Sequence, residues 1–484
     1  MTLCRCVDAF FALMMCALNV CAEPVAPIAG SSPAPGASAP VSHALPADRP
    51  QVQAEPNPRL AATEIVAFEV LLNRANHSFG SGRDDYRVTM ESIRRNLRSG
   101  WGTDKDPFKT NQLGHPVQGA MYQGFARSAG LDYWQSAGLS FAGSALWEIA
   151  GEQTHPSRND QVASGIGGTF LGEALFRMSN LVLEQGGGMP RFWREIAATA
   201  IAPSAGFNRL AFGDRYGAIF SSHDAAYFSR LQLGYSGSVK RELGTSTSDI
   251  KRNEAQVAFS IDYGLPGKPG YAYTRPFDYF NFQTTASSAN GIENVMTRGL
   301  LLGRSYEAGP NYRGVWGLYG SYDYIAPQTY RISSTALSVG STAQWWLGES
   351  LSLQGTAMAG VGYAAVGTTH GAVGERDYNY GVAPQALLDL RLTRGDNTSL
   401  DLTLREYFVS NFASGTSGGH DNIVRADVSF TFRVSKQQAV TIKLLDNRRD
   451  ASFSTLGARR QTQMTVGIFY TLLGQDRLGA VEWR

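Results

Sequence analysis

Polar or small residues recur at every fourth position along three successive segments between residues 111 and 177. The three series are Asn111, His115, Gly119, Gln123 and Arg127, then Ser136, Ser140, Ser144, Glu148 and Glu152, then Gln161, Gly165, Thr169, Glu173 and Arg177. A spacing of four places side chains above one another on one helical face. Because buried ionisable groups are costly unless they pair or serve a site, these stripes on otherwise apolar segments mark the region where function should be sought.

Helical periodicity extends through most of the first 220 residues. We expect helices over 61–74, 86–98, 133–152, 161–183 and 192–201, and another opening at His115–Pro116. Pro116 suits the first position of a helix and Asp160 suits an N-cap. The glycine run 186–188 is expected to break the helix that precedes it.

The segments 133–152 and 161–183 would present their stripes to each other if they form an antiparallel hairpin. The expected opposite pairs are Glu148 with Gly165, Ser144 with Thr169, and Ser140 with Glu173, with close backbone approach at Gly165, Gly168 and Gly172. Glu173 and Arg177 are spaced for an intrahelical ion pair. We also expect His115 and Arg127 to neutralise Glu148 or Glu152 from the preceding helix.

From about Tyr227 the period changes from four to two. Apolar and polar positions alternate over 256–263, 377–382, 400–405, 424–433 and 463–470, and about twelve such segments follow one another to the C-terminal end. Strands of about ten alternating residues are typical of a transmembrane β-barrel. The alternative is a soluble β-sandwich or barrel, in which strands are usually shorter. We therefore predict an α+β protein, with an N-terminal α-helical domain followed by an antiparallel transmembrane β-barrel of about 12 strands.

Charged residues of both signs within these strands are expected to point into the lumen and to pack it as ion pairs. They are Asp262, Arg313, Asp323, Asp389, Arg391, Asp401, Arg405, Arg425, Asp427 and Arg433. Aromatic residues near strand ends suit the interfacial girdles of a membrane barrel. Because Trp483 is penultimate, either the terminal aromatic signal of such barrels is relaxed or the last strand is 478–483.

Composition narrows the class of protein further. The 484 residues carry a net charge of +2, so no nucleic-acid partner is expected. A charged fraction of 17% with 53 glycines suits a β-rich protein better than a cytosolic enzyme. All four cysteines lie within the first 21 residues, in a segment that resembles a cleaved secretory signal peptide, with lipidation of Cys21 as the alternative. We expect a signal peptide at 1–22, a Pro/Ala/Ser-rich disordered linker at 23–58, a helical domain at 59–222 and the barrel at 223–484.

Five residues in the helical region have side chains suited to acid–base chemistry or metal binding. They are His115, Glu148, Glu152, His155 and Asp160. The spacing from Glu152 to His155 matches that of di-iron bundles, but it occurs once and Pro156 follows, where a helix ends. The competing interpretation is a structural or ligand-binding polar network of Asn111, Arg127, Ser144, Glu173 and Arg177. We expect no metal and no cofactor.

A second group of candidate residues stands just before the first strand. His223 and Asp224 follow Ser221 and Ser222, which would suit a Ser/His/Asp hydrolase only if the groups converge in space. The alternative is a periplasmic turn.

The spaced motifs between residues 100 and 215 resemble an uncharacterised bacterial family, domain of unknown function 3943. The motifs are 111–116, Arg127, 144–148 with Glu152, 156–160, 167–168, 172–173, 203–210 and 213–214. The resemblance implies an exported protein of the outer membrane. It brings no established activity, so no catalytic residue is carried over.

Two functions follow from this sequence. The first is a non-enzymatic protein of the cell outer membrane, whose helical domain lies in the periplasm or plugs the lumen, and which binds or passes a small or lipidic ligand. The second is a barrel-associated hydrolase acting on envelope lipid through His115 with Glu148 or Glu152. The expected partners are outer-membrane lipid, a small-molecule or lipid ligand, and the barrel-assembly machinery that inserts such proteins.

Overall fold

The computed structural model describes residues 55–483, apart from 81, 105, 186–187, 214–216, 244–249, 328, 368–375, 411–418, 454–456 and 476. The expected signal peptide, the possibility of lipidation at Cys21 and most of the expected linker lie outside the described residues. So do positions 186 and 187 of the expected helix break.

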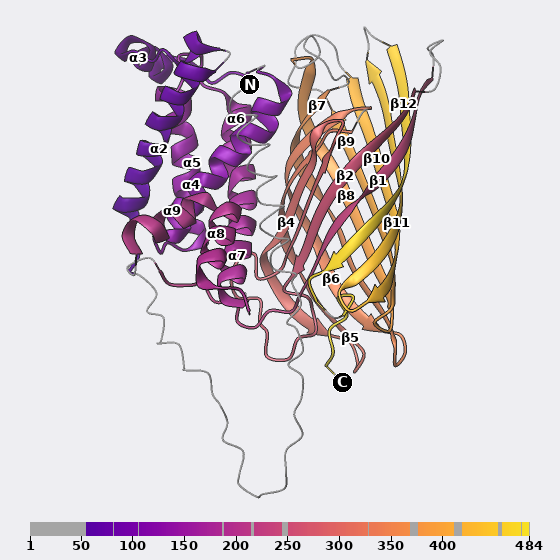
Figure 1. The fold of residues 1–484 in the computed structure, drawn as a ribbon. Coiled ribbons are helices and arrows are strands. Elements are labelled where there is room, and N and C mark those ends of the chain that lie inside the picture. Colours follow the sequence, from indigo (N-terminus) through magenta and orange to yellow (C-terminus); the bar gives the residue numbers. More distant parts are fainter. Residues whose placement is uncertain are drawn as a thin grey trace, which may run out of the picture.

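The N-terminal part of the described chain is helical (Figure 1). Its elements are α2 (Pro58–Phe79), η1 (Arg83–Tyr86), α3 (Met90–Arg98), η2 (Thr110–Gly114), α4 (His115–Ser128), α5 (Tyr133–Ala150), α6 (Arg158–Val162), η3 (Ala163–Gly167), α7 (Gly168–Gln185), α8 (Arg191–Ile201) and α9 (Pro203–Phe212). The elements η2 and η3 are single π-helical turns. The helix expected from residue 86 begins only at Met90, because Thr89 and Ser92 form a capping box there. Helix α9 was not predicted.

Twelve antiparallel strands follow and close into a barrel, as the period-two pattern predicted. They are β1 (Tyr227–Leu243), β2 (Ile250–Tyr263), β3 (Phe280–Ser287), β4 (Gly291–Glu307), β5 (Tyr312–Ile325), β6 (Arg331–Trp346), β7 (Leu351–Gly367), β8 (Tyr378–Arg394), β9 (Thr398–Ser410), β10 (Gly419–Ser435), β11 (Gln438–Phe453) and β12 (Gly457–Leu473). Each strand pairs with the next in sequence, and β1 pairs with β12, with Arg230 opposite Leu473.

Ion pairs between strands that are not neighbours identify the inner face of the barrel. Arg391 on β8 lies 3.0 Å from Asp262 on β2, and Arg230 on β1 lies 3.1 Å from Asp401 on β9. Arg405 on β9 similarly pairs with Asp323 on β5 at 2.9 Å. These contacts cross the lumen, so the charged residues fill the interior with paired charges, as their mixed signs predicted.

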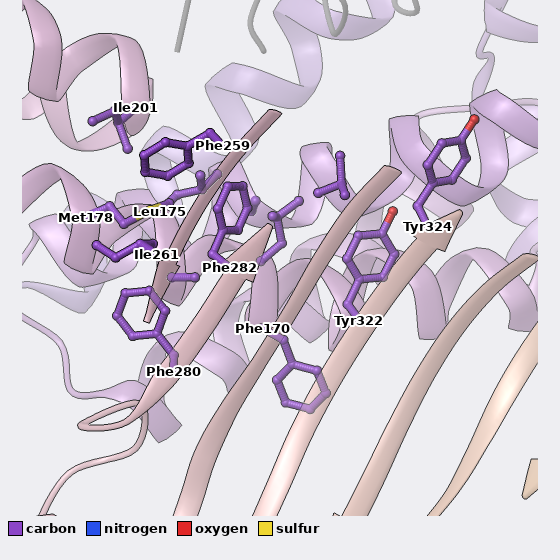
Figure 2. Packing of buried hydrophobic residues seen from close by; sticks show 14 of the residues in the cluster. Phe170, Leu175, Met178, Ile201, Phe259, Ile261, Phe280, Phe282, Tyr322 and Tyr324 are labelled. Carbon is purple, nitrogen blue, oxygen red and sulfur yellow. The ribbon is translucent and has the colours of Figure 1, made fainter. Parts of the chain in front are cut away.

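The helical domain packs against the outside of this wall. Side chains alternate between the two faces of a strand, so Phe259 and Ile261 on β2 point away from the lumen that Asp262 faces. They join one hydrophobic cluster with Phe170, Leu175 and other residues of the helices. Figure 2 shows this cluster between strands and helices, and Figure 1 shows the helices beside the barrel rather than within it. The described helices therefore do not plug the lumen, because the strand aromatics that bind them face outward.

Residues 478–483 form no strand; they turn back against the inner face at one end of the barrel. Gln344 donates a hydrogen bond to the Val481 carbonyl at 2.7 Å, and Gln354 donates to the Gly479 carbonyl at 2.6 Å. Leu478 and Val481 pack on Phe228. The last strand is thus β12, and the alternative of a strand over 478–483 is wrong.

Candidate functional site

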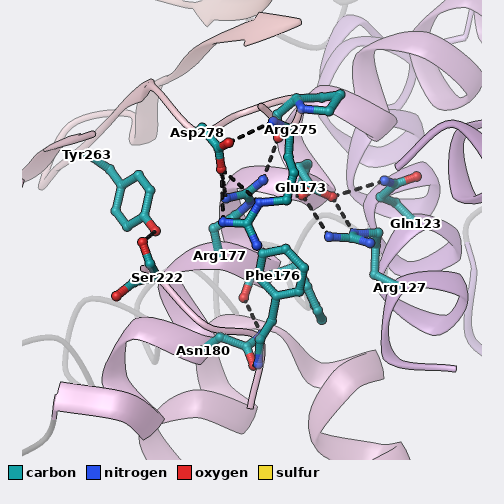
Figure 3. A network of polar contacts seen from close by, with 12 residues as sticks. Gln123, Arg127, Glu173, Phe176, Arg177, Asn180, Ser222, Tyr263, Arg275 and Asp278 are labelled. Carbon is teal, nitrogen blue, oxygen red and sulfur yellow. Dashed lines mark hydrogen bonds and ion pairs between the residues drawn. The ribbon is translucent and has the colours of Figure 1, made fainter. Parts of the chain in front are cut away.

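Glu173, on α7, is the centre of a buried ion-pair network (Figure 3). Its carboxylate lies 2.8 Å from Arg127 on α4 and 3.0 Å from Arg177 one turn further along α7. Arg177 also pairs with Asp278, at 2.9 Å, in the segment between β2 and β3. Arg275 lies 3.0 Å from Asp278. The network therefore joins two helices to the barrel.

Each charge in this network has a partner of opposite sign. The guanidinium of Arg127 additionally donates to the Leu131 carbonyl at 2.6 Å and lies 4.8 Å from the ring centres of Phe176 and Phe220. Buried ionic groups that are paired and hydrogen-bonded in this way usually hold elements in register. The pairing of Arg127, Glu173 and Arg177 favours a structural role for them.

A second buried cluster lies between α4, α5 and α6. His115 begins α4, Glu148 stands near the end of α5, and Asp160 lies within α6. One ligand atom from each of the three side chains lies within 4.8 Å of the others, and all three residues are buried. A π-helical turn adjoins each side of the cluster, since η2 ends just before His115 and η3 carries Ser164. Such turns recur at functional sites.

Neighbouring groups orient the three side chains. The imidazole Nδ1 of His115 lies 3.2 Å from the Ser164 hydroxyl. Glu148 accepts a hydrogen bond from the Ser157 amide at 2.8 Å, and Asp160 accepts one from the Asn159 side chain at 2.9 Å. The hydrogen bond at Nδ1 leaves Nε2 of His115 as the ring atom free to bind another group.

The second cluster differs from the first in its charge. Among the described residues, neither Glu148 nor Asp160 forms an ion pair with a lysine or arginine. Burial raises the pKa of Glu148 and of Asp160 well above the ordinary range, and neighbouring carboxylates raise both further. Burial also raises the pKa of Glu152 to about 7, against the opposing effect of His115. This part of the domain thus holds an excess of buried acidic groups.

Two of the five candidates lie apart from the three that converge. Helix α5 ends at Ala150, so Glu148 and Glu152 do not share a helical face. Glu152 instead accepts a hydrogen bond from the Trp147 indole at 2.6 Å. His155 is exposed in the turn before α6. Glu152 and His155 therefore lie outside a helix, and their spacing does not bring the two side chains together.

Several expected contacts are replaced by others. Arg127 binds Glu173 rather than Glu148 or Glu152. Ser157, not Asp160, caps α6, because its hydroxyl accepts from the Asp160 amide. Ser144 is buried and its hydroxyl has no hydrogen-bond partner. Asn111 donates to Asp104 at 3.1 Å and to Tyr378 of β8 at 3.0 Å.

The expected α5–α7 hairpin is not the main helix contact. A Cβ at Gly168 would lie 2.6 Å from the Gly119 Cα, and one at Gly172 would lie 2.9 Å from the Ala120 Cα, both on α4. Ser140 reaches Glu173 only through Gln123, which bonds to each. The glycines of α7 thus serve close packing against α4, because α4 lies between the two helices that were expected to pair.

Sequence reasoning missed residues that complete the surroundings of the cluster. Tyr380 of β8 accepts hydrogen bonds from Asn159 at 2.7 Å and from Gln112 at 2.8 Å. Tyr380 faces outward on the barrel, so the wall itself forms one side of the site. The signal available in the sequence was the pair of tyrosines at positions 378 and 380, which suit an interface with polar groups better than a purely lipid-facing surface.

His223 and Asp224 lie in an exposed turn before β1, and both have positive φ angles. Asp224 pairs with Lys268 at 2.8 Å. These contacts are those of a surface turn.

The fold defines a closed antiparallel barrel that carries a helical domain on its outer wall. Residues 100–204 match the family model described as Domain of unknown function (DUF3943), which confirms the resemblance noted in the sequence. The matched region includes His115, Glu148 and Asp160. No curated protein matches the chain.

Solved structures similar to the barrel half share little sequence with it. They include the NanC porin (7% identity, 49% of this chain and 98% of that one, TM-score 0.24) and the outer membrane channel DcaP of Acinetobacter baumannii (7%, 51% and 97%, TM-score 0.24). The anion-selective porin from Comamonas acidovorans is similar at 9% identity over 51% of this chain and all of that one, with a TM-score of 0.22. These scores are too low to carry an argument, so the barrel assignment rests on the strand pairing.

Proposed function

We propose that this is an outer-membrane protein in which the barrel anchors a lipid-facing helical domain. We propose further that this domain binds a small or lipidic ligand at the buried cluster of His115, Glu148 and Asp160. The observation that carries the proposal is the reversed polarity of the helical domain. Large apolar residues are exposed on α2, α5, α8 and α9, and acids and amides lie in the interior. Such an arrangement suits a hydrocarbon environment, in which apolar surface needs no burial and polar groups must be satisfied internally.

Helix α2 has this reversed polarity along most of its length. Val66, Val70 and Leu71 are exposed, whereas Glu64 and Glu69 are buried. The buried Glu64 accepts a hydrogen bond from Asn208 of α9 at 3.1 Å. In water, a helix of a globular protein has its apolar stripe toward the core and its charges outside.

A charged residue stands at each end of the apolar face of α2. Arg59 and Arg74 are both exposed, and their separation of 15 positions corresponds to about 22 Å along a helix. The apolar band of an outer-membrane barrel is about 25 Å tall. No described helix is both long enough and apolar enough to cross a membrane by itself. We propose that the helices contact lipid as a group packed on the barrel.

The barrel continues the same apolar surface. Its exposed outward residues include Val339, Val361, Ile442, Val466 and Ile468. Helix α5 shows the same polarity as α2, with Trp134 and Phe141 exposed and Ser140 buried. Because the ion pairs of Asp262, Asp401 and their arginines occupy the lumen, we propose that the barrel serves as an anchor and that the ligand binds in the helical domain.

The native tryptophans test this location. Trp134 on α5 and Trp316 on β5 are 53% and 52% exposed, whereas Trp147 is 2% exposed. Each would be kept as the single tryptophan, with phenylalanine at the other positions, in vesicles containing brominated phosphatidylcholine or in the presence of aqueous iodide.

Brominated lipid is expected to quench Trp134 as strongly as Trp316, with little effect of iodide and little quenching of Trp147 by either. Quenching of Trp134 by iodide with no effect of brominated lipid would reject the proposed lipid contact and favour a domain in the aqueous periplasm.

A second candidate function is hydrolysis of an envelope lipid. The observation in its favour is that His115 lies beside Glu148 in a domain proposed to contact lipid. Alanine at His115 or Glu148 would then abolish turnover of a lipid substrate in variants that still insert normally. Unchanged turnover in both variants would exclude this chemistry.

A further inference from the structure

We infer that His115, Glu148 and Asp160 form a binding site for a divalent transition-metal cation, with Zn²⁺ as the best fit. The sequence did not favour a metal, because the His155 and Glu152 spacing fails at the end of a helix. The structure brings Asp160 to His115 and Glu148 instead, from three separate elements. The inference is independent of the proposed lipid contact.

The ligand set fits the chemistry of zinc. One imidazole with two carboxylates is a nitrogen–oxygen donor set suited to Zn²⁺, whereas Ca²⁺ and Mg²⁺ prefer oxygen donors alone. A catalytic zinc site has three protein ligands and one open position. The three residues here supply that number.

The distances allow an ion to bind with small side-chain movements. The three ligand atoms lie within 4.8 Å of one another. The centre of a triangle with sides of that length is about 2.8 Å from each corner, whereas Zn–N and Zn–O bonds are roughly 2.0–2.2 Å. Each ligand atom therefore needs to move inward by less than about 1 Å.

Groups around the cluster support each ligand. The Ser164 hydroxyl lies 3.2 Å from Nδ1 of His115, and the Ser157 amide and the Asn159 side chain donate hydrogen bonds to Glu148 and Asp160. Outer hydrogen bonds of this kind orient metal ligands. In the network of Glu173, arginines neutralise the acidic side chains. A bound cation would do the same for Glu148 and Asp160.

Independent signs of an incomplete polar site lie in two buried side chains. Ser144, on the same face of α5 as Glu148 and one turn before it, has a fully buried hydroxyl without a hydrogen-bond partner. Asn111, one turn before His115, has a buried side-chain carbonyl oxygen without a partner. A bound ion or its water would satisfy such atoms.

Zinc binding to the purified protein in detergent micelles tests the inference. The protein is stripped with EDTA, titrated with ZnCl₂ in a calorimeter, and analysed for bound zinc after gel filtration. We expect one zinc per chain in the wild type and in His155→Ala, which removes the exposed neighbouring histidine. His115→Gln and Glu148→Gln should abolish stoichiometric binding. Ser164→Ala, which removes a positioning residue, should weaken binding by roughly 10–100-fold.

Circular dichroism of each variant separates loss of the site from loss of the fold. As a second measurement that needs no variant, Co²⁺ added to the stripped wild type should give visible absorption bands of a low-symmetry site, which Zn²⁺ then displaces. The inference is overturned if the wild type binds no zinc and shows no such bands, or if His115→Gln and Glu148→Gln retain full binding.

Discussion

The sharpest stability prediction concerns the Glu173 network. Glu173→Gln preserves the shape of the side chain and removes a charge that faces both Arg127 and Arg177. Arg177 keeps Asp278, at 2.9 Å, but Arg127 retains only the Leu131 carbonyl and two aromatic rings. Removing one partner from a buried ion pair costs about 3–5 kcal/mol, because the remaining charge is buried without compensation.

A half-buried pair in the same domain provides the control. Glu195 lies 2.7 Å from Arg209, and its side chain is 30% exposed. Glu195→Gln should cost no more than about 1 kcal/mol, because solvent screens the pair. The free energy of unfolding of each variant would be measured in micelles by urea titration, with Trp147 fluorescence reporting on the helical domain.

A double variant separates the charge from the shape. If the cost arises from an uncompensated Arg127, adding Arg127→Gln to Glu173→Gln should recover part of the lost stability, a coupling that a double-mutant cycle measures. Equal losses of stability below about 1 kcal/mol for Glu173→Gln and Glu195→Gln would refute the reasoning. Additive losses of stability for Glu173→Gln and Arg127→Gln in the double variant would also refute it.

Two further outcomes are expected. Gly168→Ala should destabilise the helical domain by about 1–3 kcal/mol, because the new Cβ would lie 2.6 Å from the Cα of Gly119. Gly138→Ala is the control: no atom lies within 4 Å of the new Cβ, so this substitution should stabilise α5 by up to about 1 kcal/mol in the same urea titration. Arg391→Ala removes the arginine paired with Asp262 and leaves Asp401 with Arg230 alone. It should lower the thermal stability of the barrel more than Arg394→Ala at the exposed end of β8, as differential scanning calorimetry would show.

The barrel could be predicted from the sequence because its signal is local. Alternation such as that from Val257 to Tyr263 specifies a strand and its two faces without reference to the rest of the chain. Counting such segments then predicted about twelve strands, and closure followed from the transmembrane barrel class. The part of the barrel's outer face that the helices cover was not predictable in this way. The alternating pattern at Phe259 and Ile261 is the same whether these side chains contact lipid or Phe170.

The candidate site was predictable in its residue types and not in its geometry. His115, Glu148 and Asp160 stood out as buried polar residues, but their convergence depends on where α5 ends and on how α6 begins. The hairpin prediction failed for the same reason: Gly168 and Gly172 specify a close neighbour without saying which helix it is. The stripes themselves carried the information that the interior of the domain is polar.

The position of α2 relative to lipid tests the central claim most directly. In a background with the four native cysteines replaced by alanine, spin labels would be placed one at a time at Leu71 on α2, Ile468 on the barrel wall and Arg94 on α3, which are all exposed. Collision rates with oxygen, which concentrates in lipid, and with a water-soluble nickel chelate would be compared in vesicles. We predict that the label at Leu71 matches that at Ile468, with high oxygen and low nickel accessibility, and differs from that at Arg94. High nickel accessibility at Leu71 together with lipid-like values at Ile468 would contradict a helical domain that lies in the membrane beside the barrel.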